Sequence, residues 1–489
     1  MAFDDVNKKS VGAVKWVYLQ TAFPKLLRPL TTVILARLLA PSVYGLVAIA
    51  STTIALLDIL RDMGMSRALI QSDENEDHVF NIVFWSNLVF GLVLYGMLLV
   101  SAPWIAGFFH QPSAVPVLRV LGFQLIVASL GAVHRNILVR RIEFDKLFVV
   151  DLLPNLIPLF VTIPLAYIGW GVWSLVVGSL AASIVQTALL WWRTSWRPKF
   201  QYDFGLGRQL LVFGFLCALE ALMGWFYVYG DNAIVGHYLD VSDLGLYTVS
   251  YNLVVMILGT LLAPVSSITF PAFSRLQHNM PELRDRLLDL VRISALISLP
   301  IGVGIALIAR PATSLIYGGK WIGLDVPLSI LAIQQGLSWV VAANPEVYKA
   351  VGRADIMPKF QALKLLYTIP IYVLGAQQNL VVFCYAKLVV VLIGMPLHLL
   401  LAVKFLHIDY RTLFAYLRVP FLAAAGMAVV VGFTQYMLRP LSGSVDWVEL
   451  LVLSLVGVAS YGLMLYILDV TMVRRMVHLG RSILAQPQA

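Results

Sequence analysis

Two cations, Lys25 and Arg28, lie near the middle of the first hydrophobic segment of the chain. A cation at bilayer depth costs at least about 2.5–3.5 kcal/mol on insertion scales, so it seldom faces lipid. Steps of three and four residues place both cations on one helical face, which they share with Tyr18, Thr21 and Thr32. This face predicts a surface that binds an anion, such as a phosphate or an acidic sugar. An internal ion pair and snorkelling to the interface are the alternatives.

An acidic counterpart occurs in the hydrophobic segment 210–236. Steps of four, three and four residues there connect Glu220, Gly224, Tyr227 and Asp231. In one interpretation the acids neutralise the cations of the first segment and hold a cavity closed on one side. In the other, Glu220 or Asp231 carries a coupling proton or sodium ion. Glu220 is the favoured coupling residue because it lies deeper in its segment, and interfacial solvation is the plain alternative for Asp231.

Two further acids lie in hydrophobic segments of the first half. Asp58 is three residues from Arg61, which predicts a local ion pair on a helix. Asp151 has Asn155 one turn later and prolines beside it, so it predicts a polar patch in a kinked helix. The patch has an ion-coupling or gating role, or a purely structural one, and both interpretations stay open.

Two ionisable residues stand out in the second half. Glu346 follows an Asn-Pro pair and precedes Lys349, so it is a candidate for a hinge pair or a gate. Lys387 lies a third of the way into its segment and is a second cation at membrane depth. It is therefore a further candidate ligand for an anion.

These residues belong to a chain whose composition is that of a polytopic membrane protein. Of its 489 residues, 60% are hydrophobic and only 12% are charged, whereas soluble proteins carry about 25% charged residues. Apolar runs of membrane-spanning length recur along the whole sequence, which predicts an all-α fold of about fourteen transmembrane helices. The expected spans are 12–36, 44–62, 79–102, 114–137, 147–168, 170–192, 210–236, 244–268, 289–309, 326–349, 358–376, 379–403, 418–438 and 447–469.

The basic residues set the expected orientation. With the N-terminus inside, 26 of the 35 Lys and Arg residues fall on cytoplasmic connections or termini, and five fall on the opposite side. This asymmetry predicts that both termini are cytoplasmic. The net charge of +9 therefore reports orientation and does not indicate nucleic-acid binding. No small-residue cleavage site follows the first apolar run, so we expect that segment to remain as a span.

An internal repeat divides the spans. Residues 31–46 and 231–246 match at an offset of 200, including the pairs Ser42/Ser242 and Gly45/Gly245. The repeat predicts two pseudo-symmetric six-helix bundles around a central cavity, as in alternating-access transporters. The expected divisions are an N-terminal bundle at 1–192, a cytoplasmic linker at 193–208, a C-terminal bundle at 209–404, and two extra helices with a cytoplasmic tail at 405–489.

Several chemical classes lack the residues they need. The sequence holds no phosphate-binding loop motif of an ATPase, no metal-ligand cluster and no large external loop for a catalytic centre. Its two cysteines, Cys217 and Cys384, argue against a disulfide framework. We therefore expect a secondary transporter without catalytic residues, metal or cofactor, in which H⁺ or Na⁺ is the candidate coupling ion.

One stretch resembles a known family. The segment that begins ILARLLAPSVYGL and ends SRALIQ is similar to the N-terminal signature of the polysaccharide transporter (Wzx-type flippase) family, closest to its WzxC-like subgroup. This family is part of the multidrug/oligosaccharidyl-lipid/polysaccharide exporter superfamily. The matching residues are Leu35, Ala36, Arg37, Leu39, Pro41, Tyr44, Gly45, Asp62, Gly64, Ser66, Ala68, Leu69 and Gln71.

The resemblance implies a flippase of the bacterial inner membrane. Such a protein moves an undecaprenyl-diphosphate-linked oligosaccharide to the periplasmic leaflet for exopolysaccharide, O-antigen or capsule synthesis. It implies alternating access without ATP, membrane lipid as a partner, and a polysaccharide polymerase and chain-length regulator as candidate partners. On this reading Lys25, Arg28 and Lys387 contact the diphosphate or acidic sugars of the cargo.

Other functions remain as alternatives. An ion-coupled drug exporter of the same superfamily would favour acids over bases in its N-terminal bundle, so Lys25 and Arg28 argue against it. A lipid II flippase also uses a cationic cavity, and the N-terminal signature argues against it. A membrane polymerase or glycosyltransferase would need a large periplasmic loop, whereas the longest external connection here, near 309–326, is short.

Overall fold

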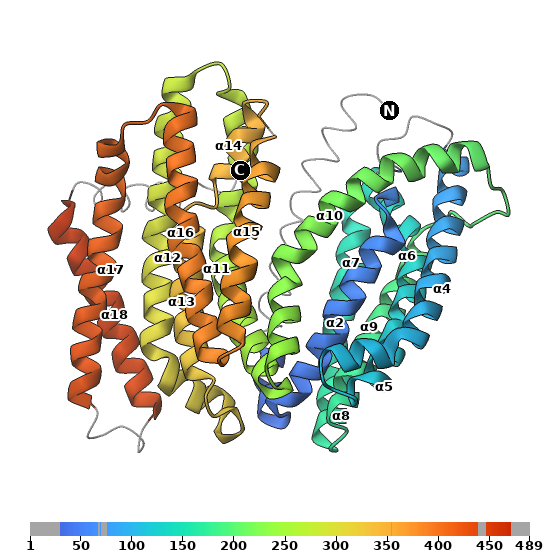
Figure 1. Ribbon diagram of the computed structural model, residues 1–489, viewed down its shortest axis with the longest axis horizontal. Coiled ribbons are helices and arrows are strands. Elements are labelled where there is room, and N and C mark those ends of the chain that lie inside the picture. The colour runs from blue at the N-terminus through green and yellow to red at the C-terminus, as the bar shows by residue number, and fades with distance from the viewer. Residues whose placement is uncertain (1–29, 67–68, 70–75, 354, 439–445, 471–489) are drawn as a thin grey trace. The chain divides into compact units, whose positions relative to one another are not determined.

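The computed structural model describes residues 30–66, 69, 76–353, 355–438 and 446–470, which form helices and turns without a strand (Figure 1). Contacts between residues divide the chain into two compact units, Met1–Thr248 and Val249–Ala489. Each unit is a bundle of helices with its own buried apolar core. The linker predicted at 193–208 lies inside the first unit, and the division into pseudo-symmetric halves around it stays a prediction.

The first unit has its first described helix at residues 30–38. Its other elements are α2 (Pro41–Asp62), α4 (Glu76–Phe108), α5 (Ala114–Gly122), α6 (Gln124–Arg140), α7 (Phe144–Ile157), the π-helical turn η1 (Pro158–Thr162), α8 (Ile163–Tyr167), α9 (Val172–Arg193), α10 (Phe204–Tyr238) and the start of α11 (Val241–Arg275). The second unit continues α11 and holds α12 (Met280–Tyr317), the 3-10 turn η2 (Gly319–Trp321), α13 (Asp325–Trp339), α14 (Asn344–Ala350), α15 (Ile356–Ala376), α16 (Leu380–Leu406), α17 (Tyr410–Leu438) and α18 (Asp446–Leu468).

The predicted all-α membrane fold is confirmed, but the count of fourteen spans is not. Within the part of the chain that the structure describes, eleven helices are long and apolar enough to cross a membrane. The bent helix α10 makes up to twelve. Each expected span from 44–62 onward nevertheless coincides with a described helix or with a broken helix. The first expected span is described only from residue 30.

A π-helical turn interrupts the helix that carries Asp151, seven residues after Asp151 itself, whereas a kink at the polar patch stays a prediction. The α-helical pattern of α7 gives way at Pro158 to η1 and resumes in α8. Because proline lacks the N–H that would donate to the preceding turn, the helix loses a backbone hydrogen bond there. Such π-helical insertions bend or widen a helix locally. The proline at position 158 thus explains the irregularity that follows the polar patch.

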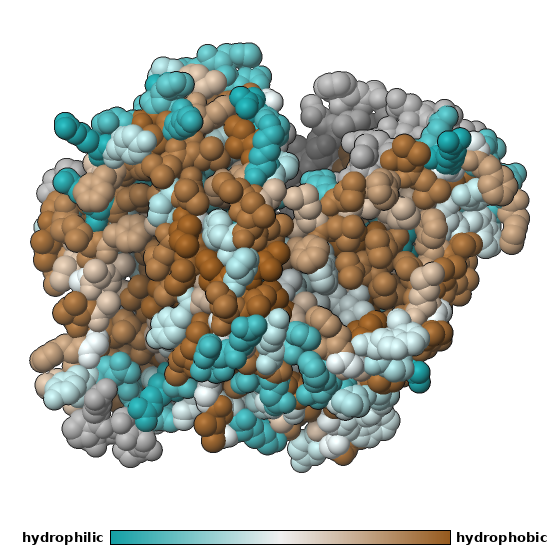
Figure 2. Space-filling view, viewed as in Figure 1, coloured by the Kyte–Doolittle hydropathy of each residue, from teal (hydrophilic) through white to brown (hydrophobic). Residues whose placement is uncertain are grey.

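Both units present apolar surfaces of the kind that lipid covers. In the unit Val249–Ala489, Figure 2 shows hydrophobic side chains over the middle of the helices and hydrophilic ones toward their ends. Large apolar side chains such as Phe433 on α17 and Val458 on α18 are 64% and 77% exposed. A water-soluble protein rarely exposes continuous apolar surface on this scale.

The two helices outside the repeat are attached to α12. Arg292 on α12 donates to Asp469, just past the end of α18, at 2.6 Å. Near the opposite end of α12, Ser314 donates to Asp446 at the start of α18 at 2.5 Å. The Tyr461 hydroxyl donates to a backbone carbonyl of α12 between these two contacts. Helix α18 is therefore fixed to α12 along its length.

The predicted repeat has a structural counterpart in the first unit. Gly45 of α2 packs against the backbone of Val241, and Gly245 of α11 packs against the backbone of Pro41. A Cβ atom at either glycine would lie 1.9 Å from the carbonyl oxygen opposite. The four residues form two pairs related by the offset of 200 found in the sequence. Helices α2 and α11 therefore begin in a reciprocal backbone contact that only glycine permits.

Candidate functional site

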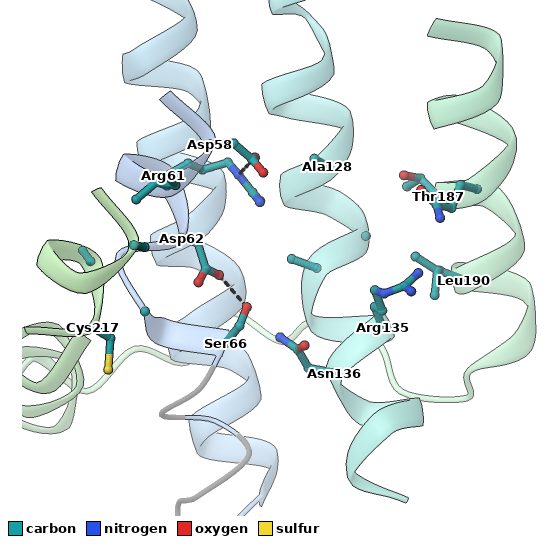
Figure 3. Close-up of a pocket in the computed structure, with 17 residues that line it drawn as sticks. Asp58, Arg61, Asp62, Ser66, Ala128, Arg135, Asn136, Thr187, Leu190 and Cys217 are labelled. Atoms are coloured by element: carbon teal, nitrogen blue, oxygen red, sulfur yellow. Dashed lines mark hydrogen bonds and ion pairs between the residues drawn. The ribbon is translucent and has the colours of Figure 1, made fainter. Parts of the chain in front are cut away.

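A cavity of about 410 Å³ lies in the first unit, between helices α2, α6, α9 and α10. Figure 3 shows ionic and amide side chains pointing into it from α2 and α6. Its lining comprises Asp58, Ile59, Arg61, Asp62, Gly64, Ser66, Ala128, Gly131, Ala132, Arg135, Asn136, Gln186, Thr187, Leu190, Cys217, Ala218 and Ala221. A polar cavity inside an otherwise apolar bundle is a candidate binding site.

The C-terminal turn of α2 supplies a charged pair to this cavity. The Nε of Arg61 donates to the Oδ1 of Asp58 at 2.8 Å, which confirms the ion pair predicted from their spacing. The Arg61 residue is only 5% exposed, whereas the Asp58 side chain is 48% exposed. The Nη1 atom of Arg61 is buried, and no group of the described residues accepts a hydrogen bond from it. A buried guanidinium nitrogen without an acceptor is costly, so this atom is available to a ligand or water.

The turn after α2 holds a second acid at the cavity. Met63 and Gly64 both have positive φ, which reverses the chain. The Ser66 hydroxyl then donates back to the Asp62 carboxylate at 2.5 Å. A Cβ at Gly64 would lie 2.6 Å from the backbone oxygen of Gly214 on α10, so this turn requires glycine. Asp62, Gly64 and Ser66 belong to the signature that the sequence shares with polysaccharide transporters, and the structure places them at the cavity wall.

Asp151 on α7 accepts hydrogen bonds from two residues of the cavity wall. The two terminal nitrogens of Arg135 donate to its two carboxylate oxygens, at 2.7 and 2.9 Å. Gln186 on α9 donates to one of these oxygens at 3.0 Å. Asn155, which the sequence pairs with Asp151, instead donates to the Asp151 backbone carbonyl. The bidentate fork is the strongest geometry of an Arg–carboxylate pair, so Asp151 fixes the positions of Arg135 and Gln186.

Sequence reasoning missed Arg135 as a site residue. Its position near the C-terminal end of a span placed it among the cytoplasmic cations that set orientation. The pair it forms joins α6 to α7 across sixteen residues of sequence, and only the packing of these helices brings the partners together. The sequence nevertheless contained a clue. Arg135 lies within the predicted span 114–137, and a cation inside a span is a candidate functional residue.

The predicted acids of α10 differ in burial. Glu220 is exposed, whereas Asp231 is 5% exposed. Asp231 accepts a hydrogen bond from the Tyr247 hydroxyl and another from the backbone N–H of Asn232, the latter at 2.8 Å. This burial argues against interfacial solvation of Asp231. A coupling role for either acid stays a prediction.

Lys387 is buried in the second unit. It lies on α16 and is 4% exposed. Its ammonium nitrogen lies 4.2 Å from the ring centroid of Tyr251 and 5.8 Å from that of Tyr372. Cation–π contacts of this kind stabilise a desolvated cation by about 2 kcal/mol or more. The predicted intramembrane cation thus lies against two aromatic rings.

Glu346 forms a local ion pair at the start of α14. Lys349 donates to it at 3.0 Å across one helical turn, which fits the hinge-pair interpretation. In the connection that follows, hydrogen bonds from Arg353 and Lys359 hold the pKa of the Asp355 carboxyl well below its usual range. Both pairs are local, and a gating role for Glu346 stays a prediction.

The remaining candidates are only partly described. Thr32 is half-buried in the helix that covers 30–38. Tyr18, Lys25 and Arg28 lie outside the described residues. The cavity thus brings Asp58 together with the partners of Asp151, whereas Lys387 and Glu346 belong to the other unit. No group of three or more His, Cys, Asp or Glu residues that could hold a metal occurs among the described residues.

Comparison with known proteins places these features in context. A family model described as "Polysaccharide biosynthesis protein" matches residues 34–325. The teichuronic acid biosynthesis protein TuaB of Bacillus subtilis is 22% identical over 87% of this chain and 89% of its own length. The succinoglycan biosynthesis transport protein ExoT of Rhizobium meliloti is 25% identical over 72% of each chain. The lipopolysaccharide biosynthesis protein WzxC of Escherichia coli is 23% identical over 76% of each chain.

Solved structures show the same fold. The lipid II flippase MurJ in an inward closed conformation superposes with a TM-score of 0.77 at 16% identity, over 94% of this chain and all of that one. An inward-facing multidrug transporter of the MATE family, from the MOP superfamily, has a TM-score of 0.60 at 15% identity, over 80% of this chain and 98% of its own. The helical arrangement of this chain is therefore the fold that these two transporters share.

Proposed function

This chain belongs to the polysaccharide biosynthesis protein family, and we propose that it is a flippase for a lipid-linked oligosaccharide in the bacterial inner membrane. Its cargo would be an oligosaccharide repeat unit on undecaprenyl diphosphate, destined for exopolysaccharide, O-antigen or capsule. The name of ExoT, a succinoglycan biosynthesis transport protein, supports this proposal. The cargo would move by alternating access, with both termini of the chain in the cytoplasm.

The observation that carries the proposal is the charged cavity in the first unit. A polar head group cannot cross hydrocarbon unaided, because every hydrogen bond to water must be replaced. The cavity offers replacements from Arg61, Asn136 and two acids within an apolar bundle. The lipid tail has no such need and can stay in the bilayer. Binding and movement of the head group, without bond making or breaking, is therefore the function that these residues suit.

Cations in the membrane would serve the anionic part of the cargo. Lys387 is buried, and Lys25 and Arg28 lie near the middle of the first hydrophobic segment of the sequence. We infer that these three contact the diphosphate or acidic sugars. Transport would be driven by H⁺ or Na⁺ through Asp231 or Glu220, without a metal or other cofactor. A polymerase and a chain-length regulator would act on the released product.

Deleting the gene in its host should block transfer of the lipid-linked oligosaccharide to the periplasmic leaflet. The measurement is the fraction of lipid-linked sugar that a lectin added to spheroplasts can reach, together with surface polysaccharide. Plasmid-borne wild-type protein should restore both. Unchanged lectin access in the deletion strain would contradict the proposed function.

Replacing Lys387 by methionine should reduce polysaccharide export about tenfold, equivalent to about 1.4 kcal/mol of lost binding. Methionine keeps the length of the side chain and removes the charge that sits over Tyr251. Lys387→Arg should retain most export. Lys404→Met on the same helix is the matched control, because Lys404 is exposed. Equal export by Lys387→Met and Lys404→Met, at equal membrane levels, would show that the buried charge is not required.

A further inference from the structure

We propose that the cavity between α2, α6, α9 and α10 binds the hydroxyl groups of a sugar residue, and not the diphosphate of the cargo. This inference rests on the proposed function and adds which part of the cargo this cavity takes. Its volume of about 410 Å³ lies within the range of roughly 300–1,000 Å³ that is usual for small-molecule sites. One buried water needs only about 30 Å³, so the cavity is built for more than an isolated water.

Two buried donors in the cavity wall lack an acceptor among the described residues. They are the Nη1 of Arg61 and the Nδ2 of Asn136. Figure 3 places Arg61 on the α2 side of the cavity and Asn136 on the α6 side. An unsatisfied buried donor costs about 1–3 kcal/mol, so a ligand that supplies oxygen atoms to both sides gains that energy. A phosphate, a carboxylate and a sugar hydroxyl all meet this first requirement.

The acidic residues of the cavity favour a sugar hydroxyl over a phosphate or a carboxylate as the ligand. Asp58 and Asp62 line the same cavity as the two donors. Both terminal nitrogens of Arg135 already donate to Asp151, so its charge is balanced by that acid. An ionised phosphate has only acceptor oxygens, and it would lie near two carboxylates with a single arginine to oppose them. A hydroxyl group both accepts and donates, so it can accept from Arg61 or Asn136 and donate to Asp58 or Asp62.

The rest of the lining suits a sugar ring. Leu190 and the small residues of α6 and α10 supply apolar surface between the polar groups. Such surface packs against the C–H faces of a pyranose, whereas a diphosphate has no apolar face. Arg, Asn, Asp and Gln side chains around a small apolar surface form a site for a neutral polyol. The diphosphate is then left to the cations proposed above.

Cys217 provides a direct test, because it lines the cavity. The other cysteine of the chain, Cys384, is buried and is replaced by alanine so that only Cys217 can react. In purified full-length Cys384→Ala protein, the rate of Cys217 alkylation by N-ethylmaleimide is measured with glucose, N-acetylglucosamine, glucuronate or pyrophosphate, each alone at equal concentration. Glucose or N-acetylglucosamine should slow alkylation about threefold, as expected when the sugar is present at about twice its Kd, and the anionic glucuronate should protect less. Pyrophosphate should leave the rate unchanged.

A variant with one donor removed makes the test specific. In Asn136→Leu the sugar should no longer protect Cys217, whereas in Gln378→Leu, which alters an exposed polar residue elsewhere, protection should persist. Protection by pyrophosphate, or by none of the sugars, would overturn the proposal. So would sugar protection that survives in Asn136→Leu. Lectin access in the deletion strain tests the proposed flippase function separately. The sugar-site proposal can therefore fail while the flippase proposal stands, and the reverse.

Discussion

Replacing Gly45 by leucine should abolish polysaccharide export, by about 100-fold or more. The Cβ of any side chain at this position would lie 1.9 Å from the carbonyl oxygen of Val241, a separation that atoms do not adopt. The start of α2 must then move away from the start of α11, because neither backbone can yield locally. Both helices begin in this contact within the first unit, so moving one of them displaces the helices that form this unit. The variant should therefore lose the packing on which the proposed transport depends.

The reciprocal geometry makes this prediction sharper. Gly245→Leu should cause a loss of the same size, because its Cβ would meet the carbonyl oxygen of Pro41 at the same distance. Gly96→Leu is the control, since no atom lies within 4 Å of the position of its Cβ. Export is measured as surface polysaccharide at matched membrane levels of each variant. Normal export by Gly45→Leu, or a loss in only one of the two glycine variants, would show that the paired contact is not needed for transport.

The glycine contact illustrates what the sequence could and could not predict. The repeat identified Gly45 and Gly245 as equivalent positions, because a shared offset is visible in the letters alone. It did not indicate that each glycine packs against the other repeat, since that depends on how α2 and α11 cross. Composition and the length of the apolar runs also predicted the all-α membrane fold. The length of a membrane-spanning helix is set by the thickness of the bilayer, and not by how the helices pack against each other.

The site shows the same limit. The pair Asp58–Arg61 could be predicted because residues three apart on a helix face the same way. The pair Arg135–Asp151 could not, because its partners lie on different helices. Bilayer depth favoured Glu220 over Asp231, yet the structure buries Asp231 and exposes Glu220. Depth along a helix and burial by neighbouring helices are separate quantities, and only the first can be estimated from one sequence.

Replacing Asp151 by alanine should also abolish export, with a lower membrane level of the protein. The change leaves the guanidinium of Arg135 without the carboxylate that accepts from both its terminal nitrogens. Removing one member of a buried pair costs about 3–5 kcal/mol, and the cost here is smaller because the Arg135 side chain is 40% exposed. The freed Arg135 and Gln186 side chains would no longer hold their places in the cavity wall.

The exchange Arg135→Asp with Asp151→Arg separates the two roles that the sequence left open for Asp151. Since both carboxylate oxygens already accept from Arg135, and Gln186 donates to one of them, the geometry favours a structural pair over a binding group for a coupling ion. The exchanged pair should then restore membrane level and a large part of export relative to Asp151→Ala. Glu143→Ala, which breaks the local pair with Lys146, is the control for loss of a carboxylate near the same helix. Restored membrane level without restored export would instead assign Asp151 a direct part in ion coupling, because the exchange keeps the ion pair but moves the carboxylate from α7 to α6.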